Sequence, residues 1–268
     1  MGLPEVGRAP RMAARWDPSQ YLRFEAERSQ PCRDLIARVL PLAPARIVDL
    51  GCGTGTSTAL LRAQWPGAST VGVDNSPEML AAARRAGPEV TWTVADIATW
   101  ATEAPYDLVF SNAALHWVPD HAALFPRLFA AVAPGGALAV QMPVNGDAPA
   151  HRRIREVAGS PRWTDRWPAD LPGSHVGPTE TYYDALAPMA RTVELWRTEY
   201  VHVLPDAPAI VEWVKGTTLR PYLTALPTDA ERTEFLGEIT EGVRAAYPSR
   251  PDGSVLFPFR RLFLVARR

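Results

Sequence analysis

Three glycines at alternate positions, Gly51, Gly53 and Gly55, follow an apolar run that carries one acid, Asp49. The run at 46–50 predicts a buried strand, and the residues after the glycines predict a helix. Because glycine lacks a Cβ atom, such a loop turns sharply and lets a ligand approach its backbone. A strand, a glycine turn and a helix in this order are typical of a loop that binds a nucleotide-type cofactor.

The spacing of the glycines narrows the class of cofactor. A dinucleotide fingerprint needs a third glycine or alanine where this chain has Thr56, which disfavours an NAD(P) oxidoreductase. The lysine-containing motif of a phosphate loop does not occur in the sequence. The pattern D-x-G-x-G-x-G resembles motif I of the class I S-adenosylmethionine (SAM)-dependent methyltransferases. A turn without a ligand and a non-catalytic SAM-binding protein are the alternatives.

Further acids follow later predicted strands at their ends. Asp74 lies about 20 residues beyond the glycine loop, where an acid can bind ribose hydroxyls, although it could also cap the helix that begins at Ser76 and Pro77. The resemblance implies that Asp96 faces the adenine amino group and that Ile97 packs on the ring. The expected cofactor-binding residues are Tyr21, Arg28, Asp49, Gly51, Gly53, Gly55, Asp74, Asn75, Asp96, Ile97 and Asn112.

Strands and helices alternate as far as Met142, and the strands are apolar enough to be buried in a parallel sheet. Right-handed crossovers then bring the glycines and acids to one edge of that sheet. The resemblance implies an α/β, Rossmann-like fold with a mostly parallel seven-stranded sheet, helices on both faces and an antiparallel last strand, which we place at 262–266. A helical cap insertion completes it.

The chain divides into three parts. We expect a disordered leader over 1–14, a SAM-binding core with an N-terminal lid helix over 15–142, and cap insertions with sheet-completing strands over 143–268. The helical spacing at 16–31 predicts the lid, which would carry Tyr21 and Arg28 to the cofactor; an amphipathic helix packed on the core is the alternative. A separate helix is expected at 32–40.

Composition excludes several classes of function. The formal net charge of −1 disfavours nucleic-acid binding, and the sequence has no apolar run long enough to span a membrane. The two cysteines, Cys32 and Cys52, lack the spacing of a metal site. We therefore expect a cytoplasmic protein without a metal, either a monomer or a weak homo-oligomer, that acts on a small molecule.

A more specific resemblance covers the chain from about Trp16 to its end. The segments W-D-P-S-Q-Y at 16–21, N-A-A-L-H-W-V-P-D-H at 112–121, W-R-T-E-Y at 196–200 and T-T-L-R-P-Y-L at 217–223 resemble the trans-aconitate 2-methyltransferase family. His116 departs from the glutamine expected at that place. The family implies methyl transfer from SAM to a carboxylate of trans-aconitate, which gives a monomethyl ester and S-adenosylhomocysteine. Another small carboxylic acid remains an alternative acceptor.

The implied chemistry needs alignment more than a base. A carboxylate is already ionised at neutral pH, so we expect no obligatory catalytic residue, although His116 is a possible base. Arginine binds carboxylates through two parallel hydrogen bonds, which favours Arg197 and Arg220, with Arg260 and Arg261 behind them. The expected substrate-binding residues are Tyr21, His116, Trp117, Tyr183, Arg197 and Arg220.

Overall fold

A computed structural model of the chain describes residues 25–87, 89–169 and 171–268, with side chains from residue 29 onward. The predicted leader, Tyr21 and most of the predicted lid lie outside the described residues, and Arg28 is described in its backbone only. The strands are β1 (Arg46–Leu50), β2 (Ser69–Asp74), β3 (Thr91–Val94), β4 (Tyr106–Asn112), β5 (Val132–Pro143), β6 (Thr192–Leu204) and β7 (Val255–Arg267).

Within the described part of the chain these strands form one seven-stranded sheet in the order β3-β2-β1-β4-β5-β7-β6. The strands from β3 to β5 pair in parallel, and β7 lies antiparallel between β5 and β6. The predicted fold class, including its antiparallel last strand, is confirmed. Because β1, β2 and β4 are parallel neighbours, the loops that follow them meet at one edge of the sheet.

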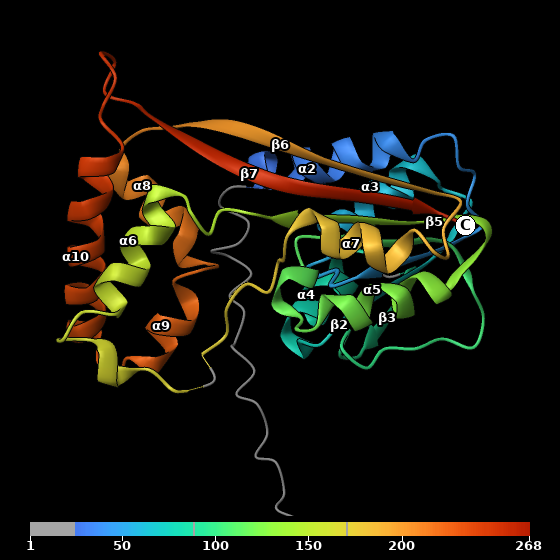
Figure 1. Cartoon of the computed structure of the whole chain (residues 1–268), viewed down its shortest axis with the longest axis horizontal. Coiled ribbons are helices and arrows are strands. Elements are labelled where there is room, and N and C mark those ends of the chain that lie inside the picture. The colour runs from blue at the N-terminus through green and yellow to red at the C-terminus, as the bar shows by residue number, and fades with distance from the viewer. Residues whose placement is uncertain (1–24, 88, 170) are drawn as a thin grey trace, which may run out of the picture.

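Helices cover the sheet on both faces (Figure 1). The α-helices are α2 (Glu25–Arg38), α3 (Thr56–Gln64), α4 (Pro77–Ala86), α5 (His121–Ala130), α6 (Pro149–Ala158), α7 (Thr179–Leu186), α8 (Ala207–Lys215), α9 (Arg220–Ala225) and α10 (Asp229–Ala246); short 3-10 turns are η1 (Leu115–Trp117) and η2 (Thr164–Arg166). Ile47 of β1 packs with α2 and α3, whereas the next residue, Val48, packs with α5 and α7. This alternation is what a two-sided sheet core requires.

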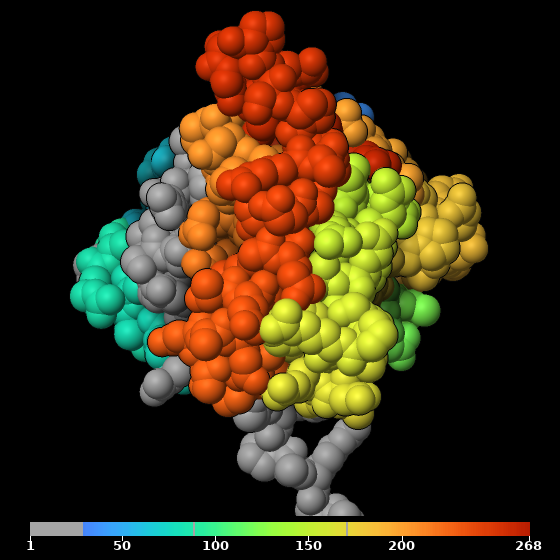
Figure 2. Space-filling view, turned by 90° about the vertical axis from the view of Figure 1, so that its left-hand side faces the viewer, coloured from blue at the N-terminus to red at the C-terminus, as the bar shows by residue number. Residues whose placement is uncertain are grey.

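Helices α6, α8, α9 and α10 form a cap with its own apolar core, at the end of the molecule where β6 and β7 extend beyond the rest of the sheet (Figure 1). Trp163, Trp213 and Phe235 are almost fully buried there. Figure 2 shows α6 and α10 side by side on the outer surface of this cap. The segment after β5 therefore leads into a group of helices with a core of its own, which corresponds to the helical cap insertion that we expected.

Two element boundaries differ from prediction. A single helix, α2, runs through Pro31, where we expected two helices that meet at this proline. Proline in a helix interior costs about 3 kcal/mol, but Leu35 of α2 and Val39, which directly follows this helix, are fully buried, and burying each contributes about 1.5–3 kcal/mol. Strand β7 begins at Val255 and includes Pro258, which pairs with β6 alone because pairing with β5 starts at Arg261.

Candidate active site

The glycine loop closes against β2 and against the segment after β4. The backbone N–H groups of Gly51 and Cys52 both donate to the carbonyl of Val73. Gly51 has a φ of +74°, and a Cβ atom at this position would lie 2.1 Å from the Cβ of Ala114. Gly53 also has a positive φ, but its missing Cβ would meet nothing nearer than a methionine methyl group at 3.6 Å. Position 51 thus requires glycine because of close packing, whereas the open space at Gly53 leaves room for a ligand.

Two carboxylates brace this loop. Asp49 is fully buried and its Oδ2 accepts hydrogen bonds from Ser57 and Thr58 at the start of α3. Burial raises its pKa to about 6, although those two hydrogen bonds act in the opposite direction. Asp74 accepts from the backbone N–H of Gly53 at 2.9 Å and from that of Ser76 at 2.9 Å, and burial raises its pKa as well. Asp74 therefore joins the glycine loop to the residue that precedes α4, and the helix itself is capped by Ser76, whose hydroxyl accepts from the backbone N–H of Met79.

The remaining predicted cofactor residues lie around the same edge. Ile97 is buried, and its Cδ1 lies 3.4 Å from the place where a Gly51 Cβ would be. Asp96 is exposed and accepts a hydrogen bond from Ala98, and Asn75 is exposed after β2. Asn112 ends β4, and its buried Oδ1 has no hydrogen-bond partner among the described residues. An orphaned acceptor of this kind fits a cofactor that brings a donor to the edge.

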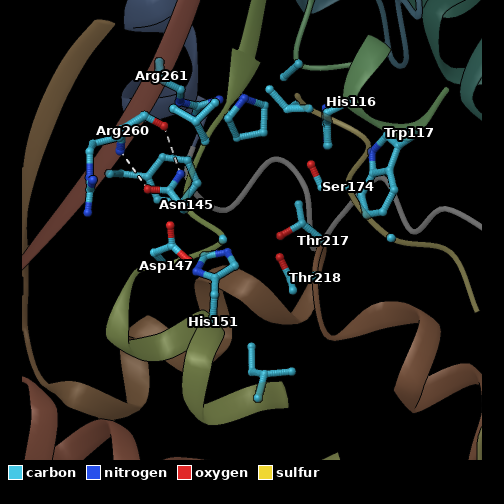
Figure 3. Close-up of a pocket in the computed structure, with 18 of the residues that line it drawn as sticks. His116, Trp117, Asn145, Asp147, His151, Ser174, Thr217, Thr218, Arg260 and Arg261 are labelled. Atoms are coloured by element: carbon cyan, nitrogen blue, oxygen red, sulfur yellow. Dashed lines mark hydrogen bonds between the residues drawn. The ribbon is translucent and has the colours of Figure 1, made fainter. Parts of the chain in front are cut away.

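A cavity of about 600 Å³ lies between this edge and the cap (Figure 3). Ala113, which has a strained φ of +55°, lines the cavity, and the next residue, Ala114, packs against Gly51. The cofactor loop and the cavity are thus separated by a single segment of chain. A group in the cavity at Ala113 would lie next to a ligand on the glycine loop, which is the arrangement that group transfer requires.

Arg261 of β7 is the most deeply placed cation of the cavity wall, with 5% of its surface exposed. Its guanidinium lies over the ring of Phe259, with its carbon 4.6 Å from the ring centroid, and it donates to the Oε1 of Gln141 at 3.5 Å. Arg260, its neighbour, is half exposed, pairs with Glu199 and extends away from the cavity in Figure 3. A buried guanidinium at the end of a cavity is suited to an anionic ligand.

His116 and Trp117 of η1 line the cavity beside Ala113. Burial, and to a smaller extent the positive charge of Arg261, lowers the pKa of His116 to about 3. Its Nδ1 has no hydrogen-bond partner within the described part of the chain. At neutral pH the ring is therefore uncharged and a weak base.

The structure brings together some of the predicted substrate residues and not others. Arg197 lines the cavity rim and donates to Thr179 at 3.0 Å. Tyr183 is 53% exposed on α7 and does not line the cavity. Arg220 does not line it either, although Tyr222 of the same helix does. Arg220 is the first residue of α9, whose start the following proline favours.

Several cavity residues were not predicted as site residues. Asn145 exchanges hydrogen bonds with the backbone of Arg260, and Asp147, His151 and Arg155 line the cavity from the segment after β5 and from α6. Asn145 and Asp147 follow the carboxyl end of a parallel strand, a signal that was available in the sequence. His151 and Arg155 had no such signal, because their place depends on how the cap packs.

Comparison with known proteins identifies the family. A family model described as a methyltransferase domain matches residues 24–187. A trans-aconitate 2-methyltransferase from Azoarcus sp. (strain BH72) is 53% identical over 94% of this chain and 99% of its own length. The enzyme of the same name from Streptomyces coelicolor is 47% identical over 97% of this chain and 88% of its own length.

Solved structures agree on the fold. The YcgJ protein of Bacillus subtilis has a TM-score of 0.57 at 12% identity, over 88% of this chain and 98% of that one. Phosphoethanolamine N-methyltransferase 2 of Haemonchus contortus, in complex with S-adenosyl-L-methionine, has a TM-score of 0.54 at 18% identity, over 89% of this chain and 52% of that one. The resemblance seen in the sequence is confirmed, and the chain belongs to the trans-aconitate 2-methyltransferase family.

Proposed function

We propose that this protein transfers a methyl group from SAM to a carboxylate of trans-aconitate, which gives a monomethyl ester and S-adenosylhomocysteine. The observation that carries the proposal is the buried guanidinium of Arg261 in a cavity whose wall, at Ala113, adjoins the glycine loop. The names of relatives about 50% identical over nearly the whole chain support the same substrate.

The residues around the glycine loop would hold the cofactor. Gly53 admits close approach to the backbone, Asp74 is placed for ribose hydroxyls, and Ile97 offers an apolar surface to the adenine. Asn112 brings an unsatisfied acceptor to the same edge. Tyr21 and Arg28 of the predicted lid remain proposed contacts. When bound, SAM supplies a methyl group activated by a sulfonium.

The cavity suits a polycarboxylate by its charge. Its charged lining residues within the described segments are Asp147 and four arginines, namely Arg155, Arg197, Arg260 and Arg261. The two histidines that line it, His116 and His151, have lowered pKa values and add no charge at neutral pH. Because Arg260 pairs with Glu199 and extends away from the cavity, the other three arginines and Asp147 leave an excess of two positive charges, which favours a ligand with several ionised carboxylates.

The residues of this chain would bind the substrate, orient its reacting carboxylate and exclude water from the site. Arg261 would bind a substrate carboxylate by two hydrogen bonds, which sets the direction of the oxygen that attacks the methyl group. The indole of Trp117 and the neutral ring of His116 would close the wall beside that oxygen. The carboxylate attacks and the sulfonium leaves as a neutral thioether, so no proton needs to move and no general base is required.

Methyl transfer from labelled SAM to a panel of acids tests the proposal. We expect turnover on trans-aconitate and much lower turnover on a monocarboxylate such as crotonate. SAM binding without turnover on any di- or tricarboxylate would contradict the proposed substrate class. Turnover on a different small acid with the same dependence on Arg261 would keep the carboxyl methyltransferase and replace trans-aconitate as its substrate.

A further inference from the structure

We propose that α6 carries a second carboxylate-binding subsite, formed by Arg155 and His151, which holds the substrate carboxylate farthest from the transferred methyl group. This inference rests on the proposed function. It assigns a role to the cap, whose side of the cavity the methyl transfer itself does not use.

The two residues lie on one side of the same helix. They are four positions apart, which places their side chains one turn above each other, and both line the cavity. His151 is 9% exposed, and its Nδ1 has no hydrogen-bond partner among the residues that the structure describes. In Figure 3 its ring rises from α6 into the cavity, with Thr217 and Thr218 on the far side of the same space. A buried polar atom left unsatisfied costs about 1–3 kcal/mol, which a ligand with a suitable partner would recover.

Arg155 supplies the charge that His151 lacks. Its Nη1 donates to the carbonyl of Gly146 at 2.6 Å, which fixes the guanidinium at the cavity rim. Burial first, and then the charge of Arg155, lower the pKa of His151 to about 4, so the ring is neutral and offers one N–H donor. A fixed guanidinium beside a neutral imidazole donor is a suitable pair for one carboxylate.

The two cationic ends of the cavity belong to different parts of the fold. Arg261 lies on β7 in the sheet, whereas Arg155 lies in the cap. A ligand with carboxylates at both ends can contact the two together, but a ligand with one carboxylate cannot. The cap pair would therefore select for the remote carboxylate without changing the alignment of the reacting one.

The test compares Arg155→Met with Arg152→Met. Met keeps the apolar stem of arginine and removes its charge, and Arg152 is an exposed residue of the same helix that does not line the cavity. We expect Arg155→Met to raise KM for trans-aconitate by about five- to thirty-fold while kcat stays within about twofold, since the lost contact is remote from the reacting carboxylate. Crotonate, which has a single carboxylate and so cannot contact both ends of the cavity, should have the same low kcat/KM with both variants and the wild type.

His151→Phe extends the test to the buried partner, with circular dichroism as the check on folding. We expect a KM change for trans-aconitate in the same direction. An unchanged KM for trans-aconitate in Arg155→Met, or an equal loss with both acids, would overturn the subsite while leaving the proposed function intact. Failure of the wild type to methylate trans-aconitate would overturn the proposed function and the subsite with it.

Discussion

Replacing Arg261 by Met should separate substrate binding from stability. The side chain lies in the cavity wall with 5% exposure, and taking a charged guanidinium out of water costs several kcal/mol. The cation–π contact with the ring of Phe259 offsets about 0.5–2 kcal/mol of this cost, and the hydrogen bond to Gln141 is long at 3.5 Å. Met fills much of the same volume without the cost of a buried charge. We therefore expect Arg261→Met to fold with a midpoint of thermal unfolding no lower than that of the wild type.

Substrate binding should respond in the opposite way. Truncating one partner of a buried, hydrogen-bonded charge pair costs about 2–5 kcal/mol. For Arg261→Met this predicts a fall in kcat/KM for trans-aconitate of about 30-fold to several thousand-fold. Arg261→Lys should recover only part of this loss, since lysine keeps the charge but not the two-pronged donor geometry.

The assay pairs steady-state kinetics with thermal unfolding of the same preparations, and SAM affinity measured by calorimetry serves as the control. SAM affinity should stay within about threefold, because Arg261 lies on the substrate side of Ala113. If Arg261→Met loses activity together with stability or with SAM affinity, Arg261 supports the fold or the cofactor, and the reasoning is wrong. Full activity in Arg261→Met would also refute it.

Three further predictions concern the edge of the sheet. His116→Gln should keep kcat within about tenfold of the wild type, because a histidine whose pKa is about 3 is not the base; a loss of about 100-fold or more would assign it that role. The pKa of Asp49 is raised from its ordinary 3.8 to about 6, so the stability of the apo protein should decrease as the pH rises from about 4 to about 6. The affinity for the cationic cofactor should change in the opposite direction, since it needs the ionised carboxylate. It should fall by up to about tenfold per pH unit as the pH drops below about 6. Calorimetry across pH 5–8 measures the second effect, and Asp49→Asn should abolish it. Gly51→Ala should destabilise the protein by about 2–4 kcal/mol in denaturant titration, since the residue has positive φ and its Cβ would overlap that of Ala114; an unchanged midpoint would refute that packing.

The core of the fold could be predicted from local patterns. Strand β1 was predicted at its observed bounds, and the acids Asp49 and Asp74 were expected at the edge where they lie. Apolar runs and glycine turns specify these features locally, and right-handed connections bring them together. Proline misled the prediction at Pro31, where we expected two helices to meet, because tertiary burial lets α2 continue through it. The last strand was predicted only at 262–266 and begins earlier, at Val255.

The substrate side could be predicted only in part. Arg197 was predicted to lie at the site and lines its rim, but Arg220, which ranked with it, does not line the cavity. Arg261, which ranked behind both, is the buried cation. The sequence shows that arginines are present but not which of them faces the cavity, since that depends on how the cap packs against the sheet.

A crystal structure of the enzyme with S-adenosylhomocysteine and trans-aconitate would decide whether Arg261 binds the reacting carboxylate. We expect one carboxylate within hydrogen-bond distance of Arg261, with an oxygen turned toward the cofactor sulfur beside Ala113. A tricarboxylate bound elsewhere, with Arg261 contacting protein groups alone, would contradict it.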